Sequence, residues 1–520
     1  QSACSPKNSV ERRMIARFLF REKIEILFGL LAAFCTMIAN RSGVGWSWDT
    51  SDYVAVGKNF ADGRGLLDAT GIPMTVRPPG LSVLLAIGDW LGLSANSSAL
   101  ALNAICASIV VVATNHLLRL ADVRESTRLI ATSLVALSPA LYWQYSMIWS
   151  EPPFIAVLAI AMIFGLRQPS ASKYLVLFAL FVSLFFIRYV GPVFAFAITL
   201  VSTLVDRKLF GALKASIANL TTFLLSLLPV WLWLQRNENL DGTLTGARTP
   251  GGGNIVGPLK TFAATLGSWV VASPVEGGIY LSWSDYPANT KIFGTIFVLV
   301  FLALATSYLV LRLRTSGFDS ISPVFVIGLA ISFVYVGFSA YRFVYFELGP
   351  LDNRMMIPIY MSIVICSAIA LDGLRPRSSL AKRILTSVFV IFVLFQGVAT
   401  ASDINQFGRD GRYWAAKDFV DLPIHRFVLS LPLDSSLMSN QPQQLFSIWR
   451  KSSVFNQYQL DLAQKESCSR RLFVWYDSKY DDGTPNLEGQ PENAPIVYSD
   501  EMSTVFDLGQ CASNINFYWP

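Results

Sequence analysis

The sequence predicts a mainly α-helical membrane protein: a polytopic bundle of about eleven spans, followed by a small α/β domain at its C-terminal end. Composition is the first reason, because 53% of the 520 residues are hydrophobic and only 15% are charged, whereas soluble domains carry about 25% charged residues. The second is that the apolar residues gather in runs of bilayer length. The net charge of +6 is spread between these runs without forming a patch, so we expect no nucleic-acid partner.

The predicted spans are the apolar runs that are long enough to cross a bilayer. One further apolar stretch, residues 78–93, is ambiguous because it is short, begins with two prolines and contains Asp89. The spans that we predict are residues 24–40, 98–118, 128–147, 152–166, 173–187, 190–205, 213–235, 292–311, 321–340, 355–372 and 384–400.

The positive-inside rule decides how the ambiguous stretch lies. If residues 78–93 stay on the membrane surface, every basic cluster between the spans falls on the cytoplasmic side; if they cross, every later cluster moves outside. We therefore expect a surface segment, a cytoplasmic N-terminus and an extracytoplasmic C-terminus. This topology gives a membrane domain over residues 1–400 and an extracytoplasmic domain over residues 401–520, and it places the loops 41–97 and 236–291 outside.

The polar C-terminal region contains short runs that predict strands and one helix. The runs SSLMSN, RLFVWYD, APIVYS and STVFDL are strand-like, and PQQLFSIWR is helix-like. Together they predict a small α/β domain. Cys468 and Cys511 lie in this region, and a disulfide between them is expected if it faces an oxidising compartment.

Two carboxylates follow the first predicted span. Asp49 and Asp52 lie in the stretch WSWDTSDY, whose tryptophans are typical of the membrane interface. The residues YVAVGKNFADGRG that begin at Tyr53 are spaced as in an amphipathic helix and stop at glycine. A helix lying on the membrane accounts for the later charges without any chemistry, but two carboxylates where polar groups are costly indicate a site.

A further acid, Glu151, opens a later span in the stretch WSEPPF. A purely structural role is open to it, because an acid in the first turn interacts favourably with the helix dipole and proline is tolerated there. The predicted topology puts Glu151 and Asp49 on the same side of the membrane. Carboxylates that converge in a partly desolvated site can act as a general base, bind a divalent cation such as Mg²⁺ or Mn²⁺, or do both.

Arginines collect at the predicted outer ends of spans and in the outer loops. Arginine at the end of a span often only reaches toward the headgroups. Several on the outer side depart from the positive-inside tendency, however, and guanidinium groups suit phosphate. An anionic lipid headgroup or a lipid-linked phosphate is therefore the expected ligand of Arg77, Arg188, Arg236, Arg248 and Arg354.

The order of these motifs resembles the GT-C superfamily of membrane glycosyltransferases, and in particular the bacterial branch of protein-mannosyltransferase-like enzymes that includes the lipid A aminoarabinose transferases. The resemblance covers residues 24–400. It is carried by Asp49-x-x-x-Tyr53, Gly63-x-Gly65, RPPGLSVLLA, SPALYWQYSMIWSEPPF, Arg188, QRN at 235–237 and NRMMIP at 353–358.

The resemblance implies transfer of a hexosyl or pentosyl group from a polyprenyl-phosphate carrier to a hydroxyl of a lipid, polysaccharide or protein. It places the reaction at the outer face of the bacterial inner membrane, in the periplasm. In this family an essential acid of the first outer loop matches Asp49, with Asp52 as the nearby alternative. A second acid matches Glu151, although the aminoarabinose transferases have aspartate before the proline.

The resemblance also implies a donor-binding set. Arg354 matches a basic residue near the donor phosphate, and Arg77, Arg188 and Arg236 match further family positions. We count Tyr53, Asn237 and Arg248 as substrate-loop residues, and the Gly-rich stretch 246–257 as a loop that closes over the donor. Transfer then uses Asp49 as base, Glu151 to position the acceptor or a metal shared with Asp49, and Arg354 as phosphate clamp.

A transporter or lipid flippase with an outer binding domain is the alternative. Such a protein places ionisable residues near the middle of the membrane, along a path. Here the spans are nearly free of charge and the acids and arginines lie at their ends. This distribution favours chemistry at the membrane surface, and it equally disfavours a scaffold whose tail binds a partner.

Overall fold

The computed structural model of the chain describes residues 24–246, 253–271, 283–346, 351–374, 379–432, 434–449, 454, 470–477, 494–500 and 503–509. The described residues are mainly helical and divide into two compact units. We call them the helical unit, made of Gln1–Ala39, Ala101–Tyr145 and Ser150–Asn405, and the mixed unit, made of Asn40–Leu100, Ser146–Trp149 and Gln406–Pro520.

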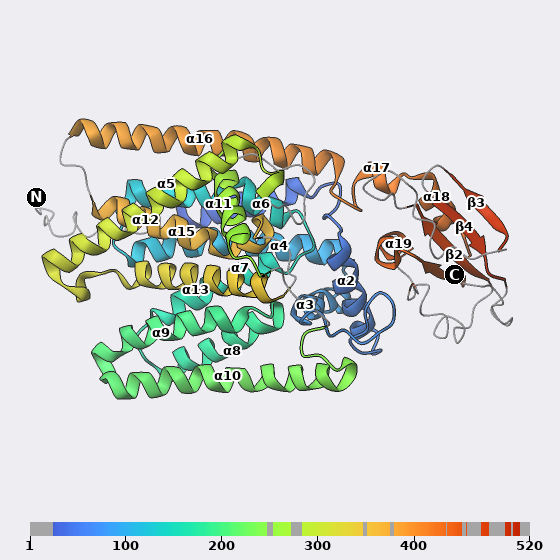
Figure 1. The fold of residues 1–520 in the computed structure, drawn as a ribbon, viewed down its shortest axis with the longest axis horizontal. Coiled ribbons are helices and arrows are strands. Elements are labelled where there is room, and N and C mark those ends of the chain that lie inside the picture. Colours follow the sequence, from blue (N-terminus) through green and yellow to red (C-terminus); the bar gives the residue numbers. More distant parts are fainter. Residues whose placement is uncertain are drawn as a thin grey trace, which may run out of the picture. The chain divides into compact units, whose positions relative to one another are not determined.

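Span-length helices dominate the helical unit (Figure 1). Further apolar helices of this unit have only 10–17 residues: Ile24–Ala39, α7 (Glu151–Gly165) and α8 (Ala171–Ile187). Helix α9 is Gly191–Phe210. The mainly helical membrane fold is thus confirmed, whereas the number of spans and their sidedness stay predictions. Within the described ranges, six helices are long and apolar enough to cross a membrane: α4 (Ala95–Leu120), α10 (Ala212–Asp241), α12 (Ala288–Ser316), α13 (Pro323–Tyr345), Asn353–Gly373, and Thr386–Asp410 within α16 (Ser379–Asp410).

The predicted span 128–147 is divided into two helices. α5 is Glu125–Ala136 and α6 is Pro139–Tyr145. Leu137 leaves the helical conformation, with φ −118° and ψ 40°. Proline has no N–H and disfavours helical geometry in the residue before it, so Pro139 explains the break.

The predicted loop 236–291 contains a helix that the sequence reading missed. α10 continues to Asp241, and α11 (Val256–Val271) packs against α12. The two backbones touch at glycine, because a Cβ on Gly267 would lie 1.9 Å from the carbonyl oxygen of Thr290.

Helices α8, α9 and α10 lie side by side (Figure 1) and share a buried polar cluster. Lys173 Nζ lies 2.7 Å from Asp206, whose other oxygen accepts from Asn219 Nδ2 at 2.8 Å. Lys173 and Asp206 are almost fully buried, and a buried ion pair is costly unless its remaining lone pairs are satisfied. This cluster fixes the register of the three helices, two of which carry candidate site residues at their far ends.

The mixed unit contains a four-stranded sheet with the order β1-β2-β4-β3. β1 and β2 are parallel, and the other two pairs are antiparallel. All four predicted strands and the predicted helix are confirmed. They are β1 (Ser436–Ser439), β2 (Arg471–Tyr476), β3 (Ile496–Ser499), β4 (Ser503–Asp507) and α19 (Pro442–Trp449), and the unit also contains the short helices α17 (Lys417–Val420) and α18 (Pro423–Ser430).

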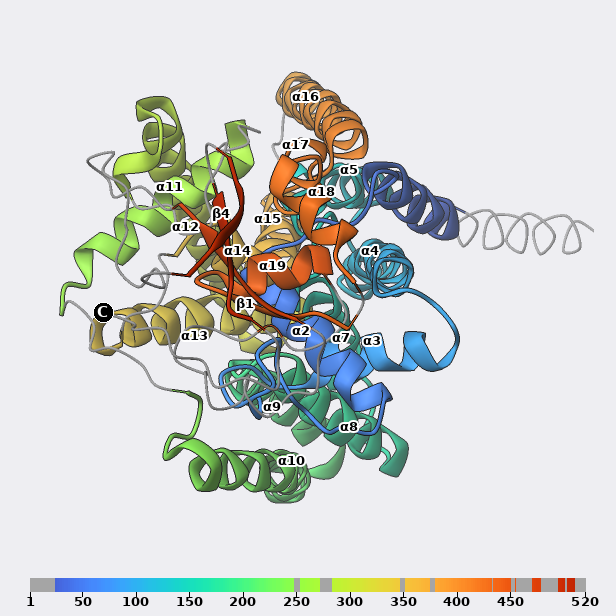
Figure 2. The ribbon, with the colours of Figure 1, turned by 90° about the vertical axis from the view of Figure 1, so that its right-hand side faces the viewer.

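Two helices of the first predicted loop also belong to the mixed unit. α2 (Trp48–Ala61) begins five residues before Tyr53 and covers residues 53–61 of the expected amphipathic stretch, and α3 (Gly80–Trp90) occupies the ambiguous stretch. Residues 50–57 of α2 are all buried, so this part of the helix is packed on every side and the expectation of one apolar and one polar face is wrong there. The C-terminal residues pack onto this loop: α19 lies beside α2 (Figure 2), and the Val454 amide donates to the Ala69 carbonyl at 2.9 Å. The first loop therefore forms its core together with segments from the end of the chain.

Candidate functional site

Asp49, Asp52 and Arg77 form a carboxylate cluster in the mixed unit. Both acids project from the first turns of α2, and Arg77 lies just before α3. One guanidinium nitrogen of Arg77 lies 2.5 Å from Asp49 Oδ1, and the other contacts Asp52 Oδ2. The side chains of Asp49 and Arg77 are each 17% exposed, and that of Asp52 is 6% exposed. One arginine thus serves two carboxylates, and Asp49 is the more accessible of them.

Burial changes the acidity of Asp52. It raises the pKa of Asp52 to about 7, because removal of the carboxylate from water outweighs the attraction of Arg77. Asp52 Oδ1 is buried and has no hydrogen-bond partner within the described residues. Since two carboxylates share one guanidinium, we expect the more buried one to hold a proton near neutral pH.

A buried hydroxyl network holds the start of α2. Trp149 Nε1 donates to Ser47 Oγ at 2.8 Å, and Thr50 Oγ1 donates to the Ile148 carbonyl at 3.0 Å. Trp46 Nε1 donates to Ser51 Oγ at 2.7 Å. Because buried polar groups are costly without partners, these bonds fix the turn that carries Asp49.

The C-terminal part of the chain takes part in this network. Ser51 Oγ donates to the carbonyl of Gln443 in α19 at 2.6 Å. The Trp414 amide donates to the Trp46 carbonyl at 3.0 Å, and the rings of Trp48 and Trp414 lie 6.4 Å apart. The position of the two carboxylates therefore depends on residues almost 400 positions later, as the separation of 392 between Ser51 and Gln443 shows.

Glu151, Arg188 and Arg354 form an arginine cluster in the helical unit. Glu151 is the first residue of α7, Arg188 follows the last residue of α8, and Arg354 lies in α14 (Asn353–Met356). Arg354 Nε donates to Glu151 Oε1 at 2.7 Å, and Arg188 forms an ion pair with the same oxygen. Glu151 is fully buried, whereas Arg354 and Arg188 are 13% and 14% exposed. The cluster carries a net positive charge, and its buried acid holds two guanidinium groups together.

The turn that carries Arg354 is fixed on both sides. The Asp352 side chain accepts from the Met355 amide at 3.0 Å and caps α14. Trp269 Nε1 of α11 donates to Asn353 Oδ1 at 2.7 Å, and Tyr335 of α13 donates to the Met355 carbonyl at 2.5 Å.

Arg236 and Asn237 lie beside the residue that follows Arg188. Asn237 is buried and donates to Tyr189 Oη at 3.1 Å. Arg236 donates to Asn237 Oδ1 at 2.9 Å and stacks 4.5 Å from the Trp233 ring. The sequence reading therefore selected a pair that supports the turn after Arg188, while Arg248 lies outside the described residues.

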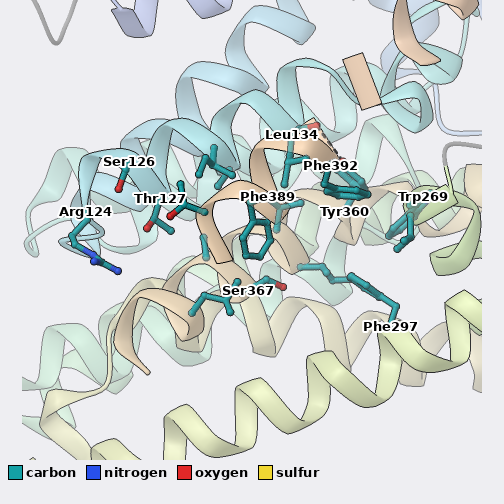
Figure 3. A pocket seen from close by; sticks show the side chains of 18 residues that line it. Arg124, Ser126, Thr127, Leu134, Trp269, Phe297, Tyr360, Ser367, Phe389 and Phe392 are labelled. Atoms are coloured by element: carbon teal, nitrogen blue, oxygen red, sulfur yellow. Dashed lines mark hydrogen bonds between the residues drawn. The ribbon is translucent and has the colours of Figure 1, made fainter. Parts of the chain in front are cut away.

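A narrow apolar pocket runs between α5, α11, α12, α15 (Tyr360–Gly373) and α16 (Figure 3). Its volume is about 180 Å³. Trp269 and Arg124 lie at opposite ends, Phe389 lies between them, and Tyr360 and Phe392 lie toward the Trp269 end (Figure 3). Since Trp269 is bonded to Asn353, the aromatic end of the pocket adjoins the segment that carries Arg354.

Comparison with solved structures identifies this architecture. The apo structure of ArnT from Cupriavidus metallidurans superposes with a TM-score of 0.60 at 12% identity, over 93% of this chain and 97% of that one. The same protein bound to undecaprenyl phosphate gives a TM-score of 0.58 at 12% identity and the same coverage. The chain has the fold of the GT-C glycosyltransferases. No family model and no curated protein sequence matches it.

At this identity the GT-C likeness establishes the fold alone. An oligosaccharyltransferase from Archaeoglobus fulgidus gives a TM-score of 0.47 at 11% identity, over 90% of this chain and 74% of that one. The roles of the residues in the two clusters must therefore come from their own chemistry.

The predicted metal site at Asp49 and Glu151 finds little support in the chemistry of Glu151. Its one bonded oxygen already receives two guanidinium groups, and these would repel a divalent cation. Asp49 and Asp52 carry a net negative charge together with Arg77 only when both acids are ionised, and in that state they are the better candidates for a cation. No group of three His, Cys, Asp or Glu side chains with metal-binding geometry occurs within the described residues.

The sequence reading missed the residues that fix the two clusters. Ser47, Thr50 and Ser51 lie in the quoted stretch WSWDTSDY, where the density of hydroxyl side chains beside tryptophans was the available signal. Tyr189 and Trp269 gave no signal, because their role depends on the packing of α8, α10 and α11.

Proposed function

We propose that this chain transfers a sugar from a polyprenyl-phosphate carrier to a hydroxyl group of an acceptor. The observation that carries the proposal is the arginine cluster, in which one buried carboxylate holds two partly exposed guanidinium groups beside an apolar pocket. Guanidinium groups bind phosphate oxygens through charge-assisted hydrogen bonds, and an apolar pocket suits a prenyl chain. The undecaprenyl phosphate bound to ArnT is a ligand of this kind.

The donor half of the reaction is assigned to Arg354 and Arg188. As the bond between the anomeric carbon and the phosphate oxygen breaks, its electron pair stays on the departing lipid phosphate. Preorganised positive charge stabilises this developing negative charge. Glu151 is assigned a positioning role, because it fixes both guanidinium groups and is itself fully buried.

The acceptor half is assigned to Asp49. As the acceptor oxygen forms its bond to the anomeric carbon, Asp49 takes the hydroxyl proton as general base. Asp49 suits this role better than Asp52 because its side chain is more exposed, 17% against 6%. Arg77 orients Asp49. Asp52 affects the basicity of Asp49, because both carboxylates contact Arg77.

The same proposal includes a location. We place the reaction at the outer face of the bacterial inner membrane, with a cytoplasmic N-terminus and the mixed unit in the periplasm, since the basic clusters between the spans would otherwise face outward. An impermeant thiol reagent applied to intact cells tests this placement. A cysteine introduced at the exposed Ser97 position is expected to be labelled, and protection of it would contradict the topology.

Transfer by the purified protein in nanodiscs tests the function. The donors are undecaprenyl phosphates that carry a radiolabelled hexose or pentose, and the acceptors are lipid, glycan and protein fractions of a bacterial envelope. We expect label to move from the donor to one fraction. Binding of undecaprenyl phosphate without any transfer would favour the transporter alternative, and absence of both would reject the proposal.

The pH dependence of transfer reports on Asp52. Its carboxyl is protonated below its folded pKa of about 7, and its ionisation makes the adjacent Asp49 a stronger base. We expect the transfer rate to rise through about pH 7. The stability of the fold changes in the opposite direction. Because the pKa of Asp52 is raised in the folded protein, the folded state binds more protons than the unfolded state between the ordinary aspartate pKa and about pH 7. The unfolding free energy therefore falls as the pH rises through this range.

Asp52→Asn should remove the rise near pH 7 and leave a flatter profile. Asp62→Asn is the matched control, because Asp62 is an exposed acid at the end of the same helix and pairs with Lys58. A rise near pH 7 that persists in Asp52→Asn would assign it to another group.

Ser51→Ala tests whether the C-terminal segment positions the carboxylates. The change removes the bond to Gln443 and leaves the buried Trp46 N–H without its acceptor. We expect a loss of about 1–3 kcal/mol in unfolding free energy and roughly a tenfold lower kcat. Affinity for undecaprenyl phosphate should stay unchanged, as should every property of Ser97→Ala, where an exposed hydroxyl is lost. Equal losses of kcat and lipid affinity would indicate general destabilisation.

A further inference from the structure

A second, polar pocket lies at the end of the helical unit away from the arginine cluster. Its volume is about 410 Å³. The 14 residues of α15, which begin just after the Arg354 turn and end at this pocket, separate the two by about 20 Å at the helical rise of 1.5 Å per residue. The lining residues come from the turn between α4 and α5 and from the last turns of α12 and α15: Ala121, Asp122, Val123, Tyr308, Leu311, Arg312, Thr315, Ile369, Asp372 and Gly373.

Arg312 lines this pocket and has no anionic partner among the residues that the structure describes. Its guanidinium lies 5.4 Å from the centre of the Tyr308 ring. Arg312 Nε is buried and finds no hydrogen-bond acceptor within the described residues, and no carboxylate among them lies in ion-pair distance. Gly373 makes room for this arrangement, because a Cβ there would lie 2.6 Å from the Tyr308 ring. A buried guanidinium nitrogen without an acceptor is costly, so the pocket suits an anion.

The two acids of the pocket differ in whether their carboxylates already have partners among the described residues. Asp372 is already engaged, since its Oδ1 accepts from Arg124 Nε and from Thr127 Oγ1, the latter at 3.3 Å. Asp122 is exposed, adopts φ +53° and forms no ion pair within the described ranges. The pocket therefore presents one cationic group and one anionic group that contacts among the described residues leave available.

We propose that this pocket binds the headgroup of a zwitterionic phospholipid that carries a primary ammonium group. Arg312 binds the phosphate, and Asp122 accepts hydrogen bonds from the ammonium. The acyl chains lie along α12, where Leu311 and Leu313 are 39% and 49% exposed. A primary ammonium donates hydrogen bonds to a carboxylate, whereas a quaternary ammonium has no N–H to donate. This site is independent of the proposed transfer reaction.

Native mass spectrometry of the protein released from nanodiscs tests the site. The nanodiscs contain equal amounts of phosphatidylethanolamine, phosphatidylglycerol and phosphatidylcholine. We expect the wild type to retain phosphatidylethanolamine preferentially and Arg312→Gln to retain about tenfold less, the effect of losing charge-assisted hydrogen bonds. Arg314→Gln, an exposed arginine of the same helix turn that does not line the pocket, should behave as wild type. Asp122→Asn should lower retention of phosphatidylethanolamine to that of phosphatidylcholine.

One further variant and one further ligand test whether the pocket binds this headgroup. Gly373→Ala, which displaces the ring under Arg312, should weaken retention without removing any charge. Equal retention by Arg312→Gln and Arg314→Gln would overturn the proposal, as would retention of the three lipids in equal amounts. Protection against thermal unfolding by millimolar inorganic phosphate, equal to that by phosphatidylethanolamine, would assign the pocket to a soluble anion instead.

Discussion

Asp49→Asn is expected to lower the rate of sugar transfer by about 10²–10⁴-fold, the contribution of a positioned general base. Asparagine keeps an oxygen that accepts from Arg77 but cannot take the hydroxyl proton. Because Asp49 is partly exposed and lies in the first turn of α2, the variant should fold normally. Labelled-donor transfer in nanodiscs measures the effect, with thermal unfolding measured in parallel.

The specificity of this loss separates catalysis from binding. Undecaprenyl phosphate should bind Asp49→Asn as tightly as the wild type, since the donor phosphate is assigned to other residues. Asp62→Asn is again the control and should keep full transfer. Wild-type transfer by Asp49→Asn would refute the base assignment. A large loss in Asp52→Asn in its place would transfer the role to that carboxylate.

Arg354→Gln is expected to reduce transfer by about 10²–10³-fold, the cost of removing one donor from a site that stabilises developing charge. Glutamine keeps a hydrogen-bond donor but loses the positive charge that faces the departing phosphate. Arg188 remains paired with Glu151 in this variant, so the fold should persist. Binding of undecaprenyl phosphate should weaken in parallel, and its salt dependence should decrease.

Comparison with Glu151→Gln distinguishes phosphate binding from simple charge balance. That variant leaves two guanidinium groups without a counter-ion and should lower the unfolding free energy by about 3–5 kcal/mol. Arg236→Gln is the matched arginine control, because Arg236 stacks on Trp233 near the cluster; transfer should fall far less. If Arg354→Gln and Arg236→Gln lost the same fraction of transfer activity, the assignment of Arg354 to the donor phosphate would be wrong.

The helices and strands were largely predictable because each follows from local chemistry. The runs RLFVWYD and STVFDL form β2 and β4 as expected, since β-branched and aromatic residues favour strands. The errors arose where local and tertiary effects compete. Pro139 divides an apolar run that composition alone makes continuous, and α11 (Val256–Val271) lies in a stretch that was predicted to be loop.

The candidate residues were also selected from the sequence, but their partners were not. Arg77 was grouped with the donor arginines, yet the structure brings it to Asp49 and Asp52, which precede it by 28 and 25 positions. Glu151 was predicted to act with Asp49, and this stays a prediction; the contacts of Glu151 are with Arg188 and with Arg354, which follows it by 203 positions.

The sequence by itself determined the membrane class, most of the helices, the strands of the C-terminal region and the acids and arginines worth testing. These follow from hydropathy, periodicity and residue chemistry, which act over a few turns of the chain. Only the tertiary structure decided which charges pair, that α19 supports α2, and that a guanidinium remains available in a polar pocket. Those features depend on the burial of charged groups far apart in the chain, and the cost of burying a charge is set by its neighbours in space.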